Sequence, residues 1–289
     1  MDYISILPIQ ALHGLVYGML LFLLASGLTL IFGMMGVLNF AHGALYMLGA
    51  YLSFTVLLWT DQFWLSLIIV PVLVGFIGVF IERVFLRKAH AHGHVAELLV
   101  TFGIAYILED VVMILWGSEP LKVEIPAILA GSLSMFGVTY PTYRLFILAV
   151  SLLVFVLLFL TLIKTRAGII VRAAVDNKEM VSALGFNVPL VFLVVFGVGA
   201  GLAGLAGVIG GPYLMTHPGM GAVILIDLFV VIVIGGLGSI KGALLAAILI
   251  GTIQSFGILF IPQFALFFQY LLLAVVLIFK PEGLLGGSK

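Results

Sequence analysis

Long apolar runs alternate with short polar connections along the whole chain. A membrane-spanning helix needs about 20 apolar residues, and runs of that kind lie near 10–32, 34–59, 63–81, 97–116, 144–163, 189–210, 222–236, 242–261 and 264–280. This pattern predicts an all-α polytopic membrane bundle of about nine spans, between eight and ten, some of them broken. The run 222–236 is short, and Gly235, Gly236 and Gly238 after it either break one longer path or make it re-entrant.

No soluble domain is expected, because the longest connections are only 82–96, 117–143 and 164–188. We therefore take residues 1–289 as one transmembrane domain. Within the segment GVGAGLAGLAGVIGG, residues 197–211, small residues recur four apart, a spacing that lets helices approach closely. We expect this segment to pack against its neighbours. The sequence GVLNFAHGAL at 36–45 is echoed by GGLGSIKGAL at 235–244, either by chance or as an internal repeat.

The basic residues predict the orientation of the chain. In a nine-span arrangement ten of the twelve Lys and Arg residues lie on one side, and only Lys122 and Arg144 lie on the other. Basic loops face the cytoplasm, so the C-terminus is expected inside and the N-terminus outside. The three tryptophans then lie at the outer interface, as an aromatic belt would: Trp59, Trp64 and Trp116.

Polar residues interrupt the second span in the stretch GMMGVLNFAHGALYMLGAY, residues 33–51. Polar side chains are costly in hydrocarbon and usually face a bundle interior or a water-filled path, and interrupted helices mark substrate sites in transporters. We expect the translocation path to be lined by Asn39, Phe40, His42, Gly43 and Tyr46, with Gly36 and Gly43 permitting a break in the helix. The alternative is a glycine-rich packing helix.

For three further sets of polar residues the sequence gives weaker evidence of a functional role. Asp227, within a wholly apolar run, is either a path residue or a structural polar contact. Glu109 and Asp110 are expected near the outer interface, with a proton relay as the alternative. HAHGH at 90–94 is expected to be flexible and without carboxylate support, and no metal site is predicted there.

The polar connection 164–188 is expected to act as a cytoplasmic coupling loop. Its residues 171–184 predict one amphipathic helix that ends at Gly185. Two basic and two acidic residues over 172–179 favour a protein partner over a lipid surface. The residues expected to serve in coupling are Arg172, Ala174, Asp176, Lys178, Glu179, Leu184 and Gly185, with the apolar side, Ala174, Val181 and Leu184, entering a groove on the partner.

Composition agrees with a membrane protein and excludes several functions. Of the 289 residues 64% are hydrophobic and 8% charged, with a mean hydropathy of +1.38. A net charge of zero gives no reason to expect nucleic-acid binding, and the absence of cysteine excludes disulfides and thiolate chemistry. The phosphate-binding sequence GxxxxGK[ST] is absent. If ATP drives transport, another chain must hydrolyse it.

Several stretches carry a resemblance to a known family. LTLIFGMMGVLNFAHGALYMLGAYL is similar to the second-span signature of permeases of branched-chain amino-acid ABC importers, the LivH type. RAGIIVRAAVDNKEMVSALGFN resembles that family's loop for contacting the ATPases, and IGGLGSIKGALLAAILIG and FKPEGLLG resemble its later motifs. Arg172 stands where the general ABC-importer loop has the glutamate of Glu-Ala-Ala.

The resemblance implies a bacterial inner-membrane permease subunit without enzymatic activity or a cofactor of its own. It would pair with a second, related permease, two cytoplasmic ATPases that bind ATP and Mg, and an external binding protein. Its substrates would be branched-chain or related hydrophobic amino acids; relatives carry urea, short amides or aromatic acids.

Two other classes remain open. A self-sufficient secondary transporter or channel would use Asp227, Glu109 and Asp110, and a membrane-embedded enzyme would use His42 or His217. The predicted docking helix 171–184 favours the permease subunit.

Overall fold

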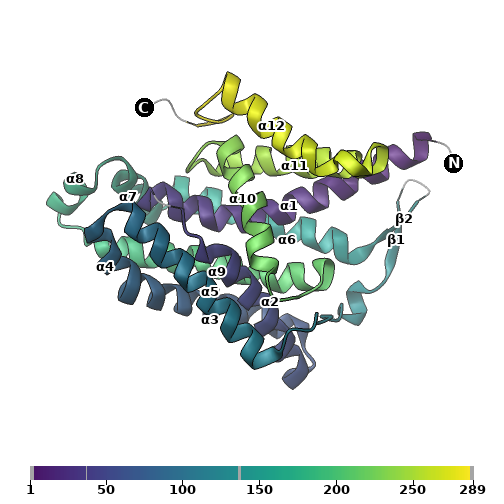
Figure 1. The fold of residues 1–289 in the computed structure, drawn as a ribbon, viewed down its shortest axis with the longest axis horizontal. Coiled ribbons are helices and arrows are strands. Elements are labelled where there is room, and N and C mark those ends of the chain that lie inside the picture. The colour runs from purple at the N-terminus through teal and green to yellow at the C-terminus, as the bar shows by residue number, and fades with distance from the viewer. Residues whose placement is uncertain (1–2, 37, 136–137, 287–289) are drawn as a thin grey trace. The chain divides into compact units, whose positions relative to one another are not determined.

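The chain is almost entirely helical, as a computed structural model shows for residues 3–36, 38–135 and 138–286 (Figure 1). Its long helices are α1 (Tyr3–Met35), α2 (Ala41–Thr60), α3 (Phe63–Ile81), α5 (His94–Trp116), α6 (Thr142–Lys164), α9 (Val188–Leu214), α10 (Met220–Gly235), α11 (Ile240–Phe260) and α12 (Ala265–Phe279). Shorter ones are a π-helix at Glu82–Leu86, α4 (Arg87–Ala89), α7 (Arg166–Asp176), α8 (Lys178–Ala183) and 3-10 turns at His90–His92, Ala127–Leu129 and Pro262–Phe264. The all-α prediction is confirmed, with one small addition.

That addition is an antiparallel hairpin in the connection between α5 and α6. It pairs β1 (Ser132–Met135) with β2 (Val138–Pro141), with Ser132 opposite Pro141. A second short backbone contact, between Leu121 and Thr216, ties the start of this connection to the segment after α9.

Each of the nine predicted spans coincides with one of the long helices. Eight helical segments in the described ranges are long and apolar enough to cross a membrane. The ninth, α10, has 16 residues. At 1.5 Å per residue it is about 24 Å long, against a hydrocarbon core of about 30 Å. The prediction that this segment is short is therefore confirmed.

Two boundaries were predicted wrongly. The second span begins at Ala41 rather than near residue 34, because Gly36 adopts a φ of +71° and ends α1. The connection 82–96 is helical as far as His92, and the chain turns only at Gly93, whose φ is +87°. The π-helix at Glu82–Leu86 carries the third span on without a break.

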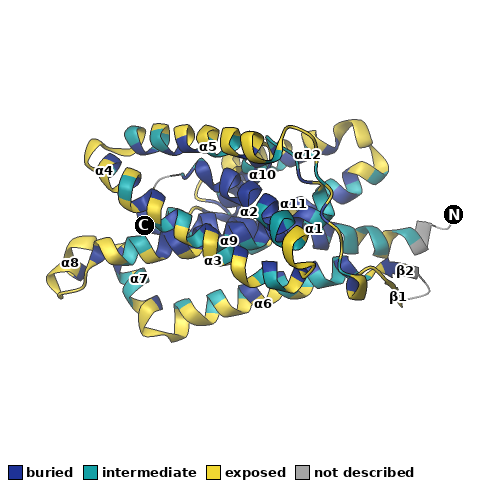
Figure 2. Cartoon of the chain, turned by 90° about the horizontal axis from the view of Figure 1, so that it is seen from below, coloured by how far each residue is buried: buried dark blue, intermediate teal, exposed yellow. Residues whose placement is uncertain are grey.

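The fold divides into two compact units. The first comprises residues 1–25, 125–154 and 227–289, and the second comprises residues 26–124 and 155–226. In the second unit α2 and α9 are largely buried, whereas α5 is largely exposed (Figure 2). The central element of the second unit is α9.

Glycines allow α9 to approach its neighbours backbone to backbone. A Cβ on Gly204 would lie 2.8 Å from Val74 of α3, and one on Gly49 of α2 would lie 2.6 Å from the carbonyl oxygen of Gly204. A Cβ on Gly207 would meet the carbonyl oxygen of Tyr46 and lie 2.7 Å from the amide nitrogen of Ala50. The prediction that residues 197–211 serve close packing is therefore confirmed.

In the first unit the same kind of contact joins α1 to α11. Gly14 leaves no room for a Cβ beside the backbone of Thr252 (2.7 Å), and Gly18 leaves none beside Ala247. Polar contacts continue along this side of α1. Ser255 donates a hydrogen bond to the carbonyl of Gln10 (2.8 Å), and Arg144 reaches the imidazole of His13.

The break after α10 is closed by a C-terminal segment of the chain, residues 281–286. The amides of Leu284 and Leu285 donate to the carbonyls of Ile234 (2.8 Å) and Gly235 (3.1 Å), the last two residues of α10. The final carbonyls of a helix need such donors. Gly236, with a φ of +98°, lies so close to Gly286 that a side chain would not fit.

The packing of α9 gives a direct test. We expect Gly207→Ala to destabilise the protein by about 1–3 kcal/mol, because the new methyl group meets backbone atoms that cannot move aside. Gly103→Ala in α5 is the matched control, since nothing lies within 4 Å of that position. The control should stabilise by roughly 0.5–1 kcal/mol through helix propensity. Thermal unfolding in detergent measures both, and equal stability of the two variants would contradict the packing role.

Candidate functional site

The break between α1 and α2 is built by Gly36 and Asn39. Asn39 is buried, with 3% of its surface exposed, and its side-chain oxygen accepts a hydrogen bond from the amide of Ala41 (3.1 Å). Its backbone carbonyl accepts from the amide of His42 (3.1 Å). Asn39 therefore provides acceptors for the first turn of α2, a role that asparagine fills well. Its side-chain Nδ2 is buried without a partner in the described ranges.

The next predicted path residues face three different helices. His42 is fully buried, and its Cε1 lies 3.0 Å from the place of a Cβ on Gly27 of α1. Gly43 contacts Gly221 of α10 backbone to backbone. Gly43 therefore lies inside α2 as a packing position, and the prediction that it helps to break the helix is wrong. Among the described residues the break lies at Gly36 and at 38–40.

Tyr46 lies deep in the second unit. It is 1% exposed, and its hydroxyl is 2.6 Å from the place of a Cβ on Gly210 of α9. This hydroxyl has no hydrogen-bond partner in the part of the chain that the structure describes. A buried hydroxyl without a partner is destabilising by about 1–3 kcal/mol. The packing around Tyr46 must offset that loss.

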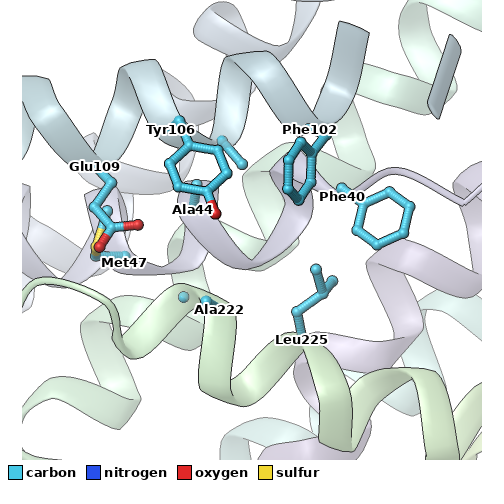
Figure 3. A pocket seen from close by; sticks show the side chains of 10 residues that line it. Phe40, Ala44, Met47, Phe102, Tyr106, Glu109, Ala222 and Leu225 are labelled. Carbon is cyan, nitrogen blue, oxygen red and sulfur yellow. The ribbon is translucent and has the colours of Figure 1, made fainter. Parts of the chain in front are cut away.

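Phe40 borders a cavity of about 90 Å³ in the second unit (Figure 3). The lining is contributed by the break and α2, by α5, and by the start of α10: Phe40, Ala44, Met47, Phe102, Ala105, Tyr106, Glu109, Gly221, Ala222 and Leu225. Three aromatic rings follow one another along it, with edge-to-face contacts between Phe40 and Phe102 (6.0 Å) and between Phe102 and Tyr106 (4.9 Å). Its one carboxylate belongs to Glu109.

Sequence reasoning missed the side of this cavity that α5 provides. Phe102, Tyr106 and Glu109 are spaced four and three apart, which places them on one helix face. That spacing was the available signal. Glu109 lies on the cavity, and Asp110 beside it is exposed and does not line it. The position of both residues near the outer interface stays a prediction.

Asp227 makes polar contacts within the first unit. It accepts hydrogen bonds from the hydroxyl of Tyr17 (3.0 Å) and from the side-chain amide of Gln269 (2.7 Å). Gln269 is fully buried, and Asp227 is half-buried. The structural contact that the sequence left open is present, and a role of Asp227 in the path stays a prediction.

The coupling loop contains two helices rather than the single helix predicted over 171–184. α7 ends at Asp176 and α8 begins at Lys178, because Asn177 is extended (φ −154°) and caps α8 through the amide of Met180 (2.8 Å). The predicted stop at Gly185 is confirmed, with a φ of +88°. The amides of Gly185 and Phe186 close the end of α8 on the carbonyls of Ser182 and Val181, the pattern of a Schellman motif.

The expected apolar face of this loop is divided between inside and outside. Ala174 and Val181 are buried within the chain, at 0% and 3% exposure, so they hold the loop in place. Leu184 is 69% exposed, as is much of Val175 and Met180. The charged residues Asp176 and Glu179 are exposed.

The two remaining charged residues of the loop are held to the spans. The guanidinium of Arg172 donates to the carbonyl of Leu162 near the end of α6. The ammonium of Lys178 lies 4.8 Å from the ring centre of Phe192 in α9, within range of a cation–π contact.

HAHGH differs from its prediction of a flexible segment without carboxylate support. Nδ1 of His90 lies 2.6 Å from the carboxylate of Glu97, which is buried. A second buried carboxylate, Glu82, lies 3.8 Å from the guanidinium of Arg87, which also donates to the carbonyl of Pro189 at the start of α9 (3.2 Å). These contacts fix the turn between α3 and α5. Within residues 3–36, 38–135 and 138–286, no three His, Asp or Glu side chains gather closely enough to hold a metal ion.

Comparison with known proteins adds the family. Residues 10–279 match the model of a family described as "Branched-chain amino acid transport system / permease component". The chain belongs to this family.

Its relatives cover nearly the whole chain. The high-affinity branched-chain amino acid transport system permease protein BraD of Pseudomonas aeruginosa is 32% identical over 96% of this chain and 95% of its own length. LivH of Salmonella typhimurium is 30% identical over 96% and 94%. The probable LivH of Methanocaldococcus jannaschii is 32% identical over 83% and 78%. No solved structure matches.

Family membership and the apolar helices together identify a multi-pass membrane permease, and the alternatives of a secondary transporter and a membrane enzyme lose their support. The echo between 36–45 and 235–244 aligns Ala41 with Ile240, the first residues of α2 and α11. It also aligns Gly36, which has a positive φ, with Gly235, which lies in α10. The two alternatives, chance and an internal repeat, both stay open.

Thiol labelling tests the predicted path, and the chain has no native cysteine to remove. In the assembled, nucleotide-free permease we expect a cysteine at Phe40, on the cavity, to react with a water-soluble thiol reagent. Cysteines at His42 and Tyr46 should be protected there, because both positions are buried. If the path opens along α2, they should become reactive in at least one nucleotide state. Protection of both in every state would reduce this stretch to packing.

Proposed function

We propose that this chain is one of two related permeases that together form the path of an ABC importer for branched-chain or similar hydrophobic amino acids. Two cytoplasmic ATPases would bind ATP and Mg and drive it, and an external binding protein would deliver the substrate. The permeases BraD and LivH, named for branched-chain amino acid transport, support this substrate class. Urea, short amides and aromatic acids are the alternative substrates.

The distribution of residues in the second unit supports an orientation. Trp59 and Trp64 flank the turn between α2 and α3, and Trp116 joins them through a hydrogen bond from its indole to Thr55 (2.8 Å). Arg87, which follows the opposite end of α3, contacts the start of α9. Lys178 contacts the same start of α9. Basic ends face the cytoplasm. The coupling loop would therefore lie on the cytoplasmic side of a bacterial inner membrane. Counting spans from there, the C-terminus would lie on the same side and the N-terminus on the other.

The observation that carries the coupling proposal is a continuous set of caps from α6 to α9. Thr165 caps α7 through the amide of Gly168 (3.1 Å), Asn177 caps α8, and Asn187 caps α9 through the amide of Leu190 (3.1 Å). Gly168 lies against the carbonyls of Thr161 and Leu162, leaving no room for a side chain. A displacement of α7 or α8 would therefore be transmitted to α6 and α9, because the connections between these helices are rigid.

The outward surface of the loop suits a protein partner. It combines the carboxylates of Asp176 and Glu179 with the apolar side chains of Val175, Met180 and Leu184. Apolar contacts would supply most of the affinity, and the charges would set orientation, contributing about 1 kcal/mol or less each. Ala174 and Gly185 would act by shaping the loop, and Arg172 and Lys178 by holding it to α6 and α9.

The first test concerns self-sufficiency. The purified chain alone should neither hydrolyse ATP nor accumulate leucine in proteoliposomes, because it has no nucleotide-binding loop. Adding the second permease, both ATPases, the binding protein and ATP should establish leucine uptake. Uptake by the chain alone under a proton or sodium gradient would contradict the proposal.

The second test concerns docking. Single cysteines at Asp176, Glu179 and Leu184 should cross-link to an ATPase subunit, and Leu184→Asp should lower substrate-stimulated ATP hydrolysis several-fold while the complex still assembles. A cysteine at Ile107, exposed on α5, is the control and should not capture an ATPase. If the loop positions fail in complexes that transport, docking belongs to another segment, first of all the turn at 87–94.

A further inference from the structure

The cavity beside α5 combines features that point to a ligand. Seven of its lining side chains are apolar, contributed by Phe40, Ala44, Met47, Phe102, Ala105, Ala222 and Leu225. Tyr106 and Glu109 add polar groups at one end (Figure 3). Small-molecule sites are typically apolar hollows with a few polar groups that fix orientation.

Glu109 is the unusual member. It lies seven residues before Trp116, the end of α5, which is roughly 10 Å along the helix. A carboxylate at such a depth is costly unless it pairs with a cation or faces water. In the described ranges Glu109 has neither a hydrogen bond nor an ion pair, the two salt bridges there being Arg87–Glu82 and His90–Glu97. Its carboxylate faces the cavity instead, beside Gly219 at the start of α10.

The cavity is open on one side, because Phe102 and Tyr106 are 48% and 56% exposed. Its volume of about 90 Å³ offers room for a branched aliphatic group of three or four carbons. Phe102 and Leu225 stand on opposite sides of this space, on α5 and α10.

We propose that this cavity is a contact site for the transported substrate, with Glu109 pairing with the ammonium group of an aliphatic amino acid and the aromatic and aliphatic lining receiving its side chain. The inference rests on the proposed transport function and assigns residues to it. A lipid chain occupying the same hollow would leave the carboxylate without a partner, so the charge favours an ammonium compound. Binding there would be weak, as passage requires release.

The experiment uses the full reconstituted transporter with its binding protein. Glu109→Gln should reduce leucine uptake at least tenfold, and Glu109→Asp should recover part of it. Asp110→Asn removes the neighbouring carboxylate, which does not line the cavity, and should change uptake less than twofold. Ala222→Leu fills the cavity and should reduce uptake as strongly as Glu109→Gln. Val223→Leu should not, because Val223, although exposed like Ala222, does not line the cavity.

Substrate protection gives a readout that does not depend on activity of the altered site. A cysteine at Ala222 should react with a thiol reagent several-fold more slowly when leucine and the loaded binding protein are present during turnover, and a cysteine at Val223 should not.

Three results would contradict the site. The first is full uptake by both Glu109→Gln and Ala222→Leu, and the second is no leucine protection of a cysteine at position 222 in any nucleotide state. The third is a cysteine at position 222 that does not react with the thiol reagent in lipid even without leucine. Each leaves the transport function intact if the unaltered complex imports leucine. Failure of the unaltered complex to import any aliphatic amino acid would instead contradict the proposed function.

Discussion

Backbone-to-backbone contact along α9 is the constraint on which the second unit depends. In lipid, helices gain little from hiding apolar side chains, because the surrounding solvent is equally apolar. Close approach at glycine replaces that driving force with dense van der Waals contact. Gly204 and Gly207 admit α2 and α3 at distances that a methyl group would forbid. The position of α2 then fixes the break at Asn39 and one wall of the cavity.

The loop proposed to couple and the cavity proposed to bind are separated along the chain but share helices. The coupling loop ends in the cap of α9 at Asn187, and α9 carries the glycines that hold α2. A displacement of the loop would therefore reach α2 through one rigid helix. The cavity lies between α2, α5 and the start of α10, so its width depends on how α2 and α5 are held. The hydrogen bond from Trp116 to Thr55 holds these two helices together near one end.

The sequence was sufficient to predict the helices, because sustained apolar runs and turn glycines are local signals. The end of α5 before Gly117 and the stop at Gly185 follow from such signals. The break before Ala41 was misplaced because apolar residues continue through it and only Gly36 and Asn39 mark it. Likewise, Asn177 split the predicted coupling helix through a cap, which composition alone did not distinguish from an exposed polar residue.

Contacts between residues far apart in the chain could not be predicted from the sequence. The pairing of His90 with Glu97 depends on the π-helix that carries α3 past the expected end of its span. The cavity needs α5 and α10 to stand opposite each other, so Glu109 could be assigned only once their packing was known. His42 and Tyr46 were recognised as unusual from sequence, and their burial against α1 and α9 emerges only from the fold.

The closure of α10 by residues 281–286 affects the order in which parts of the fold are completed during synthesis. The carbonyls of Ile234 and Gly235 receive their donors from Leu284 and Leu285, fifty positions later in the chain. Synthesis proceeds from the N-terminus, so α10 is made before those donors exist. Until they are added, the end of α10 must rely on water or headgroups at the membrane surface. Residues made later thus complete a helix made earlier, and α10 reaches its final form only after Leu285 has been added.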